Sequence, residues 1–431
     1  MKNIIFFARV NIWLVCAGLV LSACEKGPEL AISSDEIIIE ATSTETSFDI
    51  SANIEWRATV ILTEKRWLIV EPSSGRGNAT ITIKADENLE FTERIALIII
   101  SGIGMKTDTV KVKQAPSIDV AEKIEDKIFK KYCLENFDKS PSDGKISLKE
   151  ALKVTEINVK GLGISTLTGI EYFTKLRRLN CSDNKIEILD VSMNDSINKL
   201  ECYKNPIKTI DVHKLSKLAE LNLHTTNIKN IDVSKNAALK YLTISSSPIT
   251  AINVTENKEL LELLCNDNQL TELDISKNTK LQMLYCVNNK ISTLNLSANS
   301  NLQHLWCNNQ TDGNRKLLTN LDISRNKALI TFSCAQNGIT TLNLSQNTEL
   351  TQLRCEENLL TDLDISQNTN IRDLKCNNNK FADVIDISNN TKLKYIDFRK
   401  NPSLSTIHVW KDFDENNSFY EKDKSARWVV K

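Results

Sequence analysis

Glycine, proline and histidine are scarce in this chain, which has 12 Gly, 7 Pro and 4 His among 431 residues. The low glycine and proline counts argue against a disordered chain. No charge of one sign dominates, because 54 basic residues face 55 acidic ones. A nearly neutral chain offers no polybasic surface, so we expect neither a nucleic-acid partner nor electrostatic binding to a membrane.

Spacings typical of catalytic sites are also missing. The four histidines form no recognisable Ser/His/Asp or Cys/His arrangement, and the sequence contains no phosphate-binding loop, CxxC pair or HExxH helix. The paired carboxylates of Glu356 and Glu357 fall at the expected end of a strand, where we predict a solvated surface. We therefore expect no enzymatic activity and no cofactor.

The first 24 residues are typical of an export signal. Lys2 and Arg9 precede an apolar run that ends in Leu21-Ser22-Ala23-Cys24. A basic start, a short apolar core and small residues before a cleavage site predict a secretory signal. The ending resembles a bacterial lipobox, which implies a signal peptide over residues 1–23, a lipid on Cys24 and a tether over 24–29. The alternative is an uncleaved anchor helix, since about 20 residues span a bilayer.

Eight cysteines reveal a repeat of 21 residues, as in the spacing of Cys265, Cys286 and Cys307. Around each cysteine the frame is L-x-x-L-x-C-x-x-N-x-[LI], and it continues where Leu or Ile replaces Cys. Most units carry a second block such as Leu273-Asp274-Ile275-Ser276. This frame resembles the leucine-rich repeat, which implies a solenoid of stacked units over residues 159–405 with a parallel concave β-sheet.

Alternation along each strand assigns the two faces of the predicted sheet. Leu284 and Cys286 share one side and Met283 and Tyr285 the other. We predict that the Leu/Cys side is the core, that its cysteines are buried free thiols, and that the other side is exposed. On the exposed side, an apolar group between polar flanks predicts a partner-binding surface, and its members are Tyr241, Leu264, Met283, Tyr285, Val287, His304 and Trp306. The alternative is that this group is covered by the chain's own C-terminal segment or by a contact with a second copy of the chain.

Residues 30–116 follow a different, two-residue period, which predicts an Ig-like β-sandwich. Trp56, Trp67, Pro72-Ser73-Ser74-Gly75, Arg94 and Gln114-Ala115 stand in an order that resembles the BACON domain of Bacteroidetes. The resemblance implies carbohydrate binding. Both tryptophans lie in strand-like runs, so the other interpretation is that they are core residues and the domain is a spacer.

Residues 117–158 are predicted to be a helical connector that caps the first repeat, and residues 406–431 a C-terminal cap. Within the connector, Asp143 and Glu150 match two positions of an EF-hand loop, and Asp138 would reach in through a bulge. These three carboxylates are weak calcium candidates, since Lys139 and Pro141 occupy ligand positions. The alternative is that the segment is only a cap.

Taken together, the chain resembles a Bacteroidetes lipoprotein with a BACON domain and leucine-rich repeats. The resemblance implies a protein anchored by lipid in the outer membrane, at the cell surface or on the periplasmic face. We expect it to bind a protein partner through the concave sheet, as an adhesion or recognition protein does. Glycan binding and a purely structural role in the envelope are the alternatives.

Overall fold

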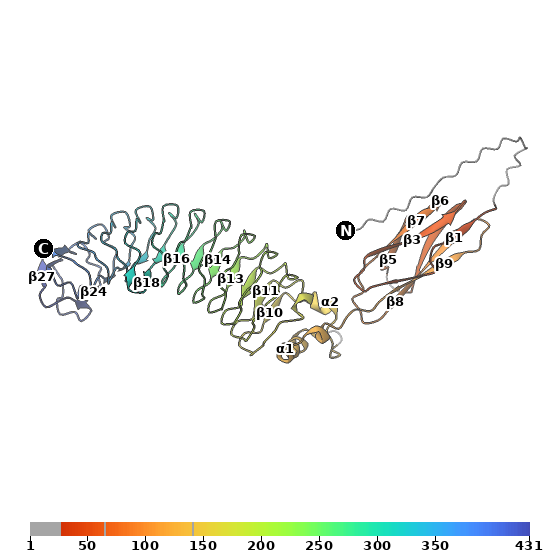
Figure 1. Cartoon of the computed structure of the whole chain (residues 1–431), viewed down its shortest axis with the longest axis horizontal. Coiled ribbons are helices and arrows are strands. Elements are labelled where there is room, and N and C mark those ends of the chain that lie inside the picture. Colours follow the sequence, from red (N-terminus) through yellow and green to blue (C-terminus); the bar gives the residue numbers. More distant parts are fainter. Residues whose placement is uncertain (1–26, 64–65, 140–141) are drawn as a thin grey trace, which may run out of the picture. The chain divides into compact units, whose positions relative to one another are not determined.

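The computed structural model describes residues 27–63, 66–139 and 142–431. They form two compact units that divide between Ser117 and Ile118, each with its own apolar core. Cys24 and the predicted signal peptide lie outside the described residues. In Figure 1 the first unit is orange-brown and the second runs from yellow to blue.

The first unit is a β domain of two sheets. One sheet has the order β1-β3-β7-β5 and the other β2-β9-β8-β4-β6. Its strands are β1 (Leu30–Ile32), β2 (Glu36–Ile39), β3 (Glu45–Ala52), β4 (Glu55–Leu62), β5 (Leu68–Glu71), β6 (Ser74–Arg76), β7 (Ala79–Ala85), β8 (Arg94–Gly102) and β9 (Asp108–Gln114). Alternate side chains of both sheets, such as Ile81 of β7 and Ile98 of β8, are fully buried in one core. The predicted two-residue period is therefore confirmed.

A short helical segment begins the second unit. It consists of η1 (Val120–Lys123), α1 (Lys127–Phe137) and α2 (Leu148–Ala151), and it leads to β10 (Glu156–Asn158). Asp126 caps α1 by accepting hydrogen bonds from two backbone N–H groups of its first turn. Phe129 and Cys133 of α1 are fully buried in the core of the repeats. The helices therefore close the first end of the stack.

A parallel sheet of thirteen strands runs through the repeats, in the order β10 to β17, β20, β21, β22, β24 and β26. After a short η2 (Ile170–Tyr172), the strands are β11 (Arg178–Asn180), β12 (Lys199–Glu201), β13 (Glu220–Asn222), β14 (Tyr241–Thr243), β15 (Glu262–Leu264), β16 (Met283–Tyr285), β17 (His304–Trp306), β20 (Thr331–Ser333), β21 (Gln352–Arg354), β22 (Asp373–Lys375), β24 (Tyr395–Asp397) and β26 (Tyr420–Glu421). Figure 1 shows them along the inner side of a curved stack.

The predicted faces of this sheet are confirmed. Leu284 and Cys286 are fully buried, while Met283 and Tyr285 remain partly accessible. All nine cysteines in the described residues are buried free thiols, as predicted. The Leu/Cys frame thus builds the core, because a strand sends alternate side chains to opposite faces.

A ladder of asparagines fixes the turn after most strands of the main sheet, and Thr226, Ser247 and Gln310 take the same position after β13, β14 and β17. The Nδ2 group of Asn289 donates hydrogen bonds to the backbone carbonyls of Cys265, Cys286 and Val287, and its Oδ1 accepts one from the N–H of Leu270. Buried backbone groups that no strand pairs are satisfied in this way. The frame's asparagine is therefore required by the turn and not by a ligand.

Two features depart from the regular repeat. The six extra residues between Cys307 and Cys334 contain a small hairpin of β18 (Thr311–Asp312) and β19 (Arg315–Lys316). Near the end, β23 (Asp383–Asp386), β25 (Leu404–Val409) and β27 (Arg427–Val430) form a separate three-stranded sheet. The last residues also supply β26, which joins the main sheet beyond β24.

Candidate functional site

The seven predicted partner-binding residues lie on or directly after four neighbouring strands, β14 to β17. In one row across these strands Tyr241, Glu262, Met283 and His304 are register partners. In the next row Leu264, Tyr285 and Trp306 follow one another, and Val287 comes just after β16. Register partners of neighbouring strands lie about 4.8 Å apart. The structure therefore brings the predicted residues together on one face.

Two rings form the centre of this group. The rings of Tyr285 and Trp306 are stacked, with centroids 4.7 Å apart and an interplanar angle of 18°. Both side chains are half-buried, and burial, followed by the charge of Glu262, raises the pKa of the Tyr285 hydroxyl. Stacked aromatic rings stabilise each other beyond their buried area, so the pair presents a preformed apolar surface.

The other members differ in how accessible they are. Tyr241 is 39% exposed and is the most open ring of the group, whereas Leu264, Met283, Val287 and His304 are half-buried. The imidazole Nδ1 of His304 lies 2.9 Å from the hydroxyl of Thr331, which fixes the ring against the next strand. The C-terminal segment joins the far end of the sheet through β26, beyond β24. It therefore does not cover these strands.

Charged residues flank the group on both sides, and most are paired with each other. Lys199 contacts Glu220 at 2.9 Å and Glu201 at 3.5 Å on the N-terminal side. Arg354 contacts Asp373 at 3.3 Å on the C-terminal side. These charged side chains thus form ion pairs with one another along the sheet. These ion pairs offset part of the charge on both flanks, while the apolar centre remains partly accessible.

Sequence reasoning missed a second aromatic group on the same face. The rings of Tyr203 and His224 are stacked, with centroids 4.6 Å apart and an interplanar angle of 15°. The ammonium of Lys160 lies 5.3 Å from the Tyr203 centroid. Tyr203 follows Cys202 in the repeat frame as Val287 follows Cys286. The same rule that selected Val287 could therefore have found Tyr203.

Glu356 differs from the sequence prediction. Its side chain is half-buried and not solvated, and burial raises the pKa of its carboxyl group. Neighbouring Arg354 and Lys375 act in the opposite direction. The prediction of a solvated surface was wrong for Glu356, because one of its two carboxylate oxygens is buried.

The calcium candidates are engaged with backbone groups. The carboxylate of Asp138 accepts hydrogen bonds from the N–H groups of Asp143 and Gly144, at 3.2 and 2.8 Å. Glu150 accepts one from the N–H of Lys139 at 2.9 Å and forms a capping box with Ser147. Within the described residues, no three His, Cys, Asp or Glu side chains gather as a metal site would require. These carboxylates hold the turn before α2.

The two tryptophans of the first unit are core residues. Trp56 is 3% exposed and Trp67 is 6% exposed. The indole N–H of Trp56 donates to the carbonyl of Gly77 at 2.8 Å, and the Arg94 guanidinium lies 4.4 Å from the Trp67 ring. A sugar-binding platform needs an accessible ring, and these two rings are covered.

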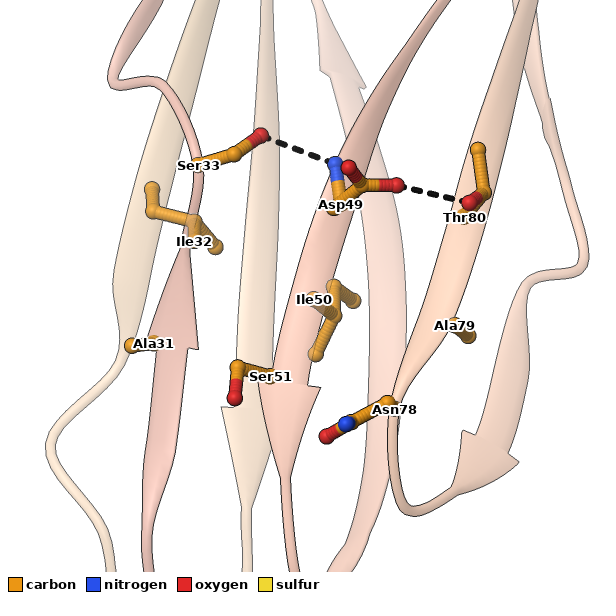
Figure 2. Close-up of a pocket in the computed structure, with 9 residues that line it drawn as sticks. All are labelled: Ala31, Ile32, Ser33, Asp49, Ile50, Ser51, Asn78, Ala79 and Thr80. Carbon is orange, nitrogen blue, oxygen red and sulfur yellow. Dashed lines mark hydrogen bonds between the residues drawn. The ribbon is translucent and has the colours of Figure 1, made fainter. Parts of the chain in front are cut away.

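The first unit also has a hollow of about 500 Å³ over β1, β3 and β7. Figure 2 shows its short polar and aliphatic lining, in which Asp49 accepts a hydrogen bond from the Thr80 hydroxyl at 2.6 Å. The backbone N–H of Asp49 donates to the Ser33 hydroxyl at 2.8 Å. The lining residues include no aromatic or basic side chain. The hollow therefore lacks the aromatic rings that β14 to β17 present on the repeat sheet.

A parallel sheet with a Leu/Cys core and an asparagine ladder is the leucine-rich-repeat fold. Among solved structures, the internalin InlF of Listeria monocytogenes str. 4b F2365 is similar, with 19% identity and a TM-score of 0.54 over 72% of this chain and 98% of that one. The functional domain of InlJ from Listeria monocytogenes, which includes a cysteine ladder, shows 25% identity and a TM-score of 0.44 over 70% of this chain and 80% of that one.

Residues 56–115 match the BACON family, described as "Putative binding domain, N-terminal". No curated protein sequence matches the chain. Among the helices in the described part of the chain, none has the length and apolar character needed to cross a bilayer. The first unit thus carries a match to the BACON family, and the second has the leucine-rich-repeat fold.

Proposed function

We propose that this protein binds a protein partner on the concave face of its repeats, around the stacked rings of Tyr285 and Trp306. The first unit acts as a spacer, and a lipid on Cys24 holds the protein in the outer membrane. The proposal of a spacer is supported by the burial of Trp56 and Trp67, which leaves little of either ring exposed.

The aromatic group on β14 to β17 carries this proposal. Tyr and Trp are enriched among the residues that contribute most to binding between proteins, and an apolar centre within a polar rim is typical of such surfaces. Tyr285 and Trp306 are stacked before any partner arrives. Little side-chain entropy is therefore lost when they are covered.

Capture of a partner from host or envelope extracts tests the proposal. The bait is the chain from residue 27 onward, compared with the same chain carrying Tyr285→Ala and Trp306→Ala. We expect the first bait to retain a discrete protein and the second to lose it. A matched control with Ser297→Ala, on an exposed turn outside the strands, is expected to retain it.

A second pair of baits tests whether the first unit is only a spacer. The chain from residue 27 onward is compared with the same chain lacking residues 30–116, and both are expected to capture the same protein. If capture instead follows the first unit, or if glycan arrays bind the chain and Tyr285→Ala has no effect, the proposed role of the concave face is wrong.

A further inference from the structure

Glu262 stands out among the charged side chains of the concave face. It is half-buried on β15, between its register partners Tyr241 and Met283. Among the described residues, its carboxylate has no ion-pair or hydrogen-bond partner. By contrast, Lys199 is paired with two glutamates and Arg354 with Asp373. Glu262 is therefore an unneutralised negative charge inside an apolar surface.

The surroundings of Glu262 are suited to an aliphatic cation. Met283 and Leu264 supply apolar surface beside it, and Tyr241 and Tyr285 supply aromatic rings. Lysine and arginine side chains bury their methylene stems along apolar surface while the charged head stays with a polar group. Aromatic rings also attract a cation positioned over their faces.

The nearest cations on the same face are already engaged. The side chain of Lys199 lies three strands away on β12 and contacts Glu201 and Glu220. Glu356, another half-buried acid on this face, has two basic neighbours, Arg354 and Lys375, which lower the pKa of its carboxyl group while burial raises it. Glu262 has no such basic neighbour in the strand register.

A neutral partner surface laid over Glu262 would bury an uncompensated carboxylate, which is strongly unfavourable. A partner that supplies a positive charge at this point removes that penalty. We infer that the concave face receives a lysine or arginine side chain of its partner at Glu262, beside Tyr241, Leu264, Met283 and Tyr285. This inference rests on the proposed function, since it names the chemistry of the partner that the same face would bind.

A library of short random peptides displayed on phage tests the inference. The library is panned against the chain from residue 27 onward and, in parallel, against the Glu262→Gln variant, which removes the charge and keeps the shape. We expect lysine and arginine to be enriched on the unmodified chain and not on the variant. The Glu262→Lys variant is expected to enrich acidic residues instead, since it reverses the charge.

Affinity measurements on one selected peptide give the magnitude. We expect Glu262→Gln to weaken binding about tenfold or more, and to remove most of its dependence on salt concentration. The matched control is Glu259→Gln, because Glu259 lies outside β15 and is paired with Lys280 at 2.6 Å. Its affinity for the peptide is expected to be unchanged. Melting temperatures of both variants establish that the fold is intact.

Two outcomes separate this inference from the proposed function. If peptides without basic residues are selected, or if Glu262→Gln binds as well as the unmodified chain, the inference is wrong. If Trp306→Ala still abolishes capture of the natural partner in that case, the proposed binding face is supported and only the inference of a basic side chain at Glu262 is rejected. If neither Trp306→Ala nor Glu262→Gln affects binding to any ligand, the proposed function and the inference are both wrong.

Discussion

The ring of Tyr285 lies flat against the ring of Trp306 on the next strand, with centroids 4.7 Å apart and an interplanar angle of 18°. The two residues are register partners on β16 and β17. On the opposite face of the same strands, Leu284 and Leu305 are fully buried in the core. The stack is thus held from below by the core of the solenoid. A partner bound at this face would meet one preformed aromatic surface and not two independent side chains.

The cysteine positions of the core should tolerate apolar residues and reject charge. Cys286 is fully buried, and burial raises the pKa of its thiol to about 12. We expect Cys286→Asp to lower the free energy of unfolding by several kcal/mol, because a buried carboxylate would lack a partner. Cys286→Leu should be tolerated, because Leu223 fills the same position of the frame. Urea denaturation of both variants checks this.

The same thiol should not react with an alkylating reagent in the folded protein, since a thiol with a raised pKa stays protonated at neutral pH. Labelling of Cys286 is expected only after the protein has been unfolded.

The result of the denaturation experiment could also contradict the assignment of Cys286 to the core. A Cys286→Asp chain that unfolds at the same urea concentration as the unmodified chain would show that the residue does not face the core.

The turn after each strand holds a residue in the left-handed backbone region, and at Thr225 that residue is β-branched, with φ of 55°. This conformation is unfavourable for β-branched side chains and much less so for asparagine, which Asn378 provides at the equivalent turn with φ of 57°. We therefore expect Thr225→Asn to stabilise the solenoid by about 0.5–1 kcal/mol.

The reverse substitution Asn378→Thr is the matched control and should destabilise by a similar amount. Thermal or urea unfolding measures both changes. A stabilised Asn378→Thr chain together with a destabilised Thr225→Asn chain would contradict the role assigned to the left-handed turn.

The lipid anchor is a prediction from residues 21–24 of the sequence. The Cys24 thiol would carry the lipid, so Cys24→Ser should abolish incorporation of a palmitate analogue and release the protein from membranes. Several acyl chains hold a protein much more firmly than one. The Cys133→Ser variant is a suitable control, because Cys133 is buried in the second unit. Labelling of the Cys24→Ser chain would refute the lipobox interpretation.

The repeats could be predicted closely because their period forces each unit to stack on the next. Once Leu284 and Cys286 are assigned to the core, alternation places Tyr285 and Trp306 on the opposite face without further information. The same logic brought the predicted binding residues onto four adjacent strands. It also predicted the buried thiols, since a cysteine in a leucine position of the frame must face inward.

Contacts that depend on how side chains lean across strands could not be predicted. The stacking of Tyr203 on His224 and the partial burial of Glu356 depend on side-chain rotamers, which the repeat frame does not specify. In the first unit, β2 pairs with β9 although some 70 residues separate them, and such long-range pairing leaves no local pattern. The three-stranded sheet of β23, β25 and β27 was missed because β25 and β27 do not follow the repeat frame, although β23 runs into the second block of its repeat.

Titration calorimetry of the captured partner against Tyr285→Ala, Trp306→Ala and the double variant tests the central claim most directly. We expect each single variant to weaken binding by about 2 kcal/mol or more, roughly thirtyfold, and the double variant to lose less than the sum because the rings support each other. Melting temperatures should stay nearly unchanged. Unaltered affinity in all three variants, or loss of fold in the single variants, would contradict a binding site on the concave face.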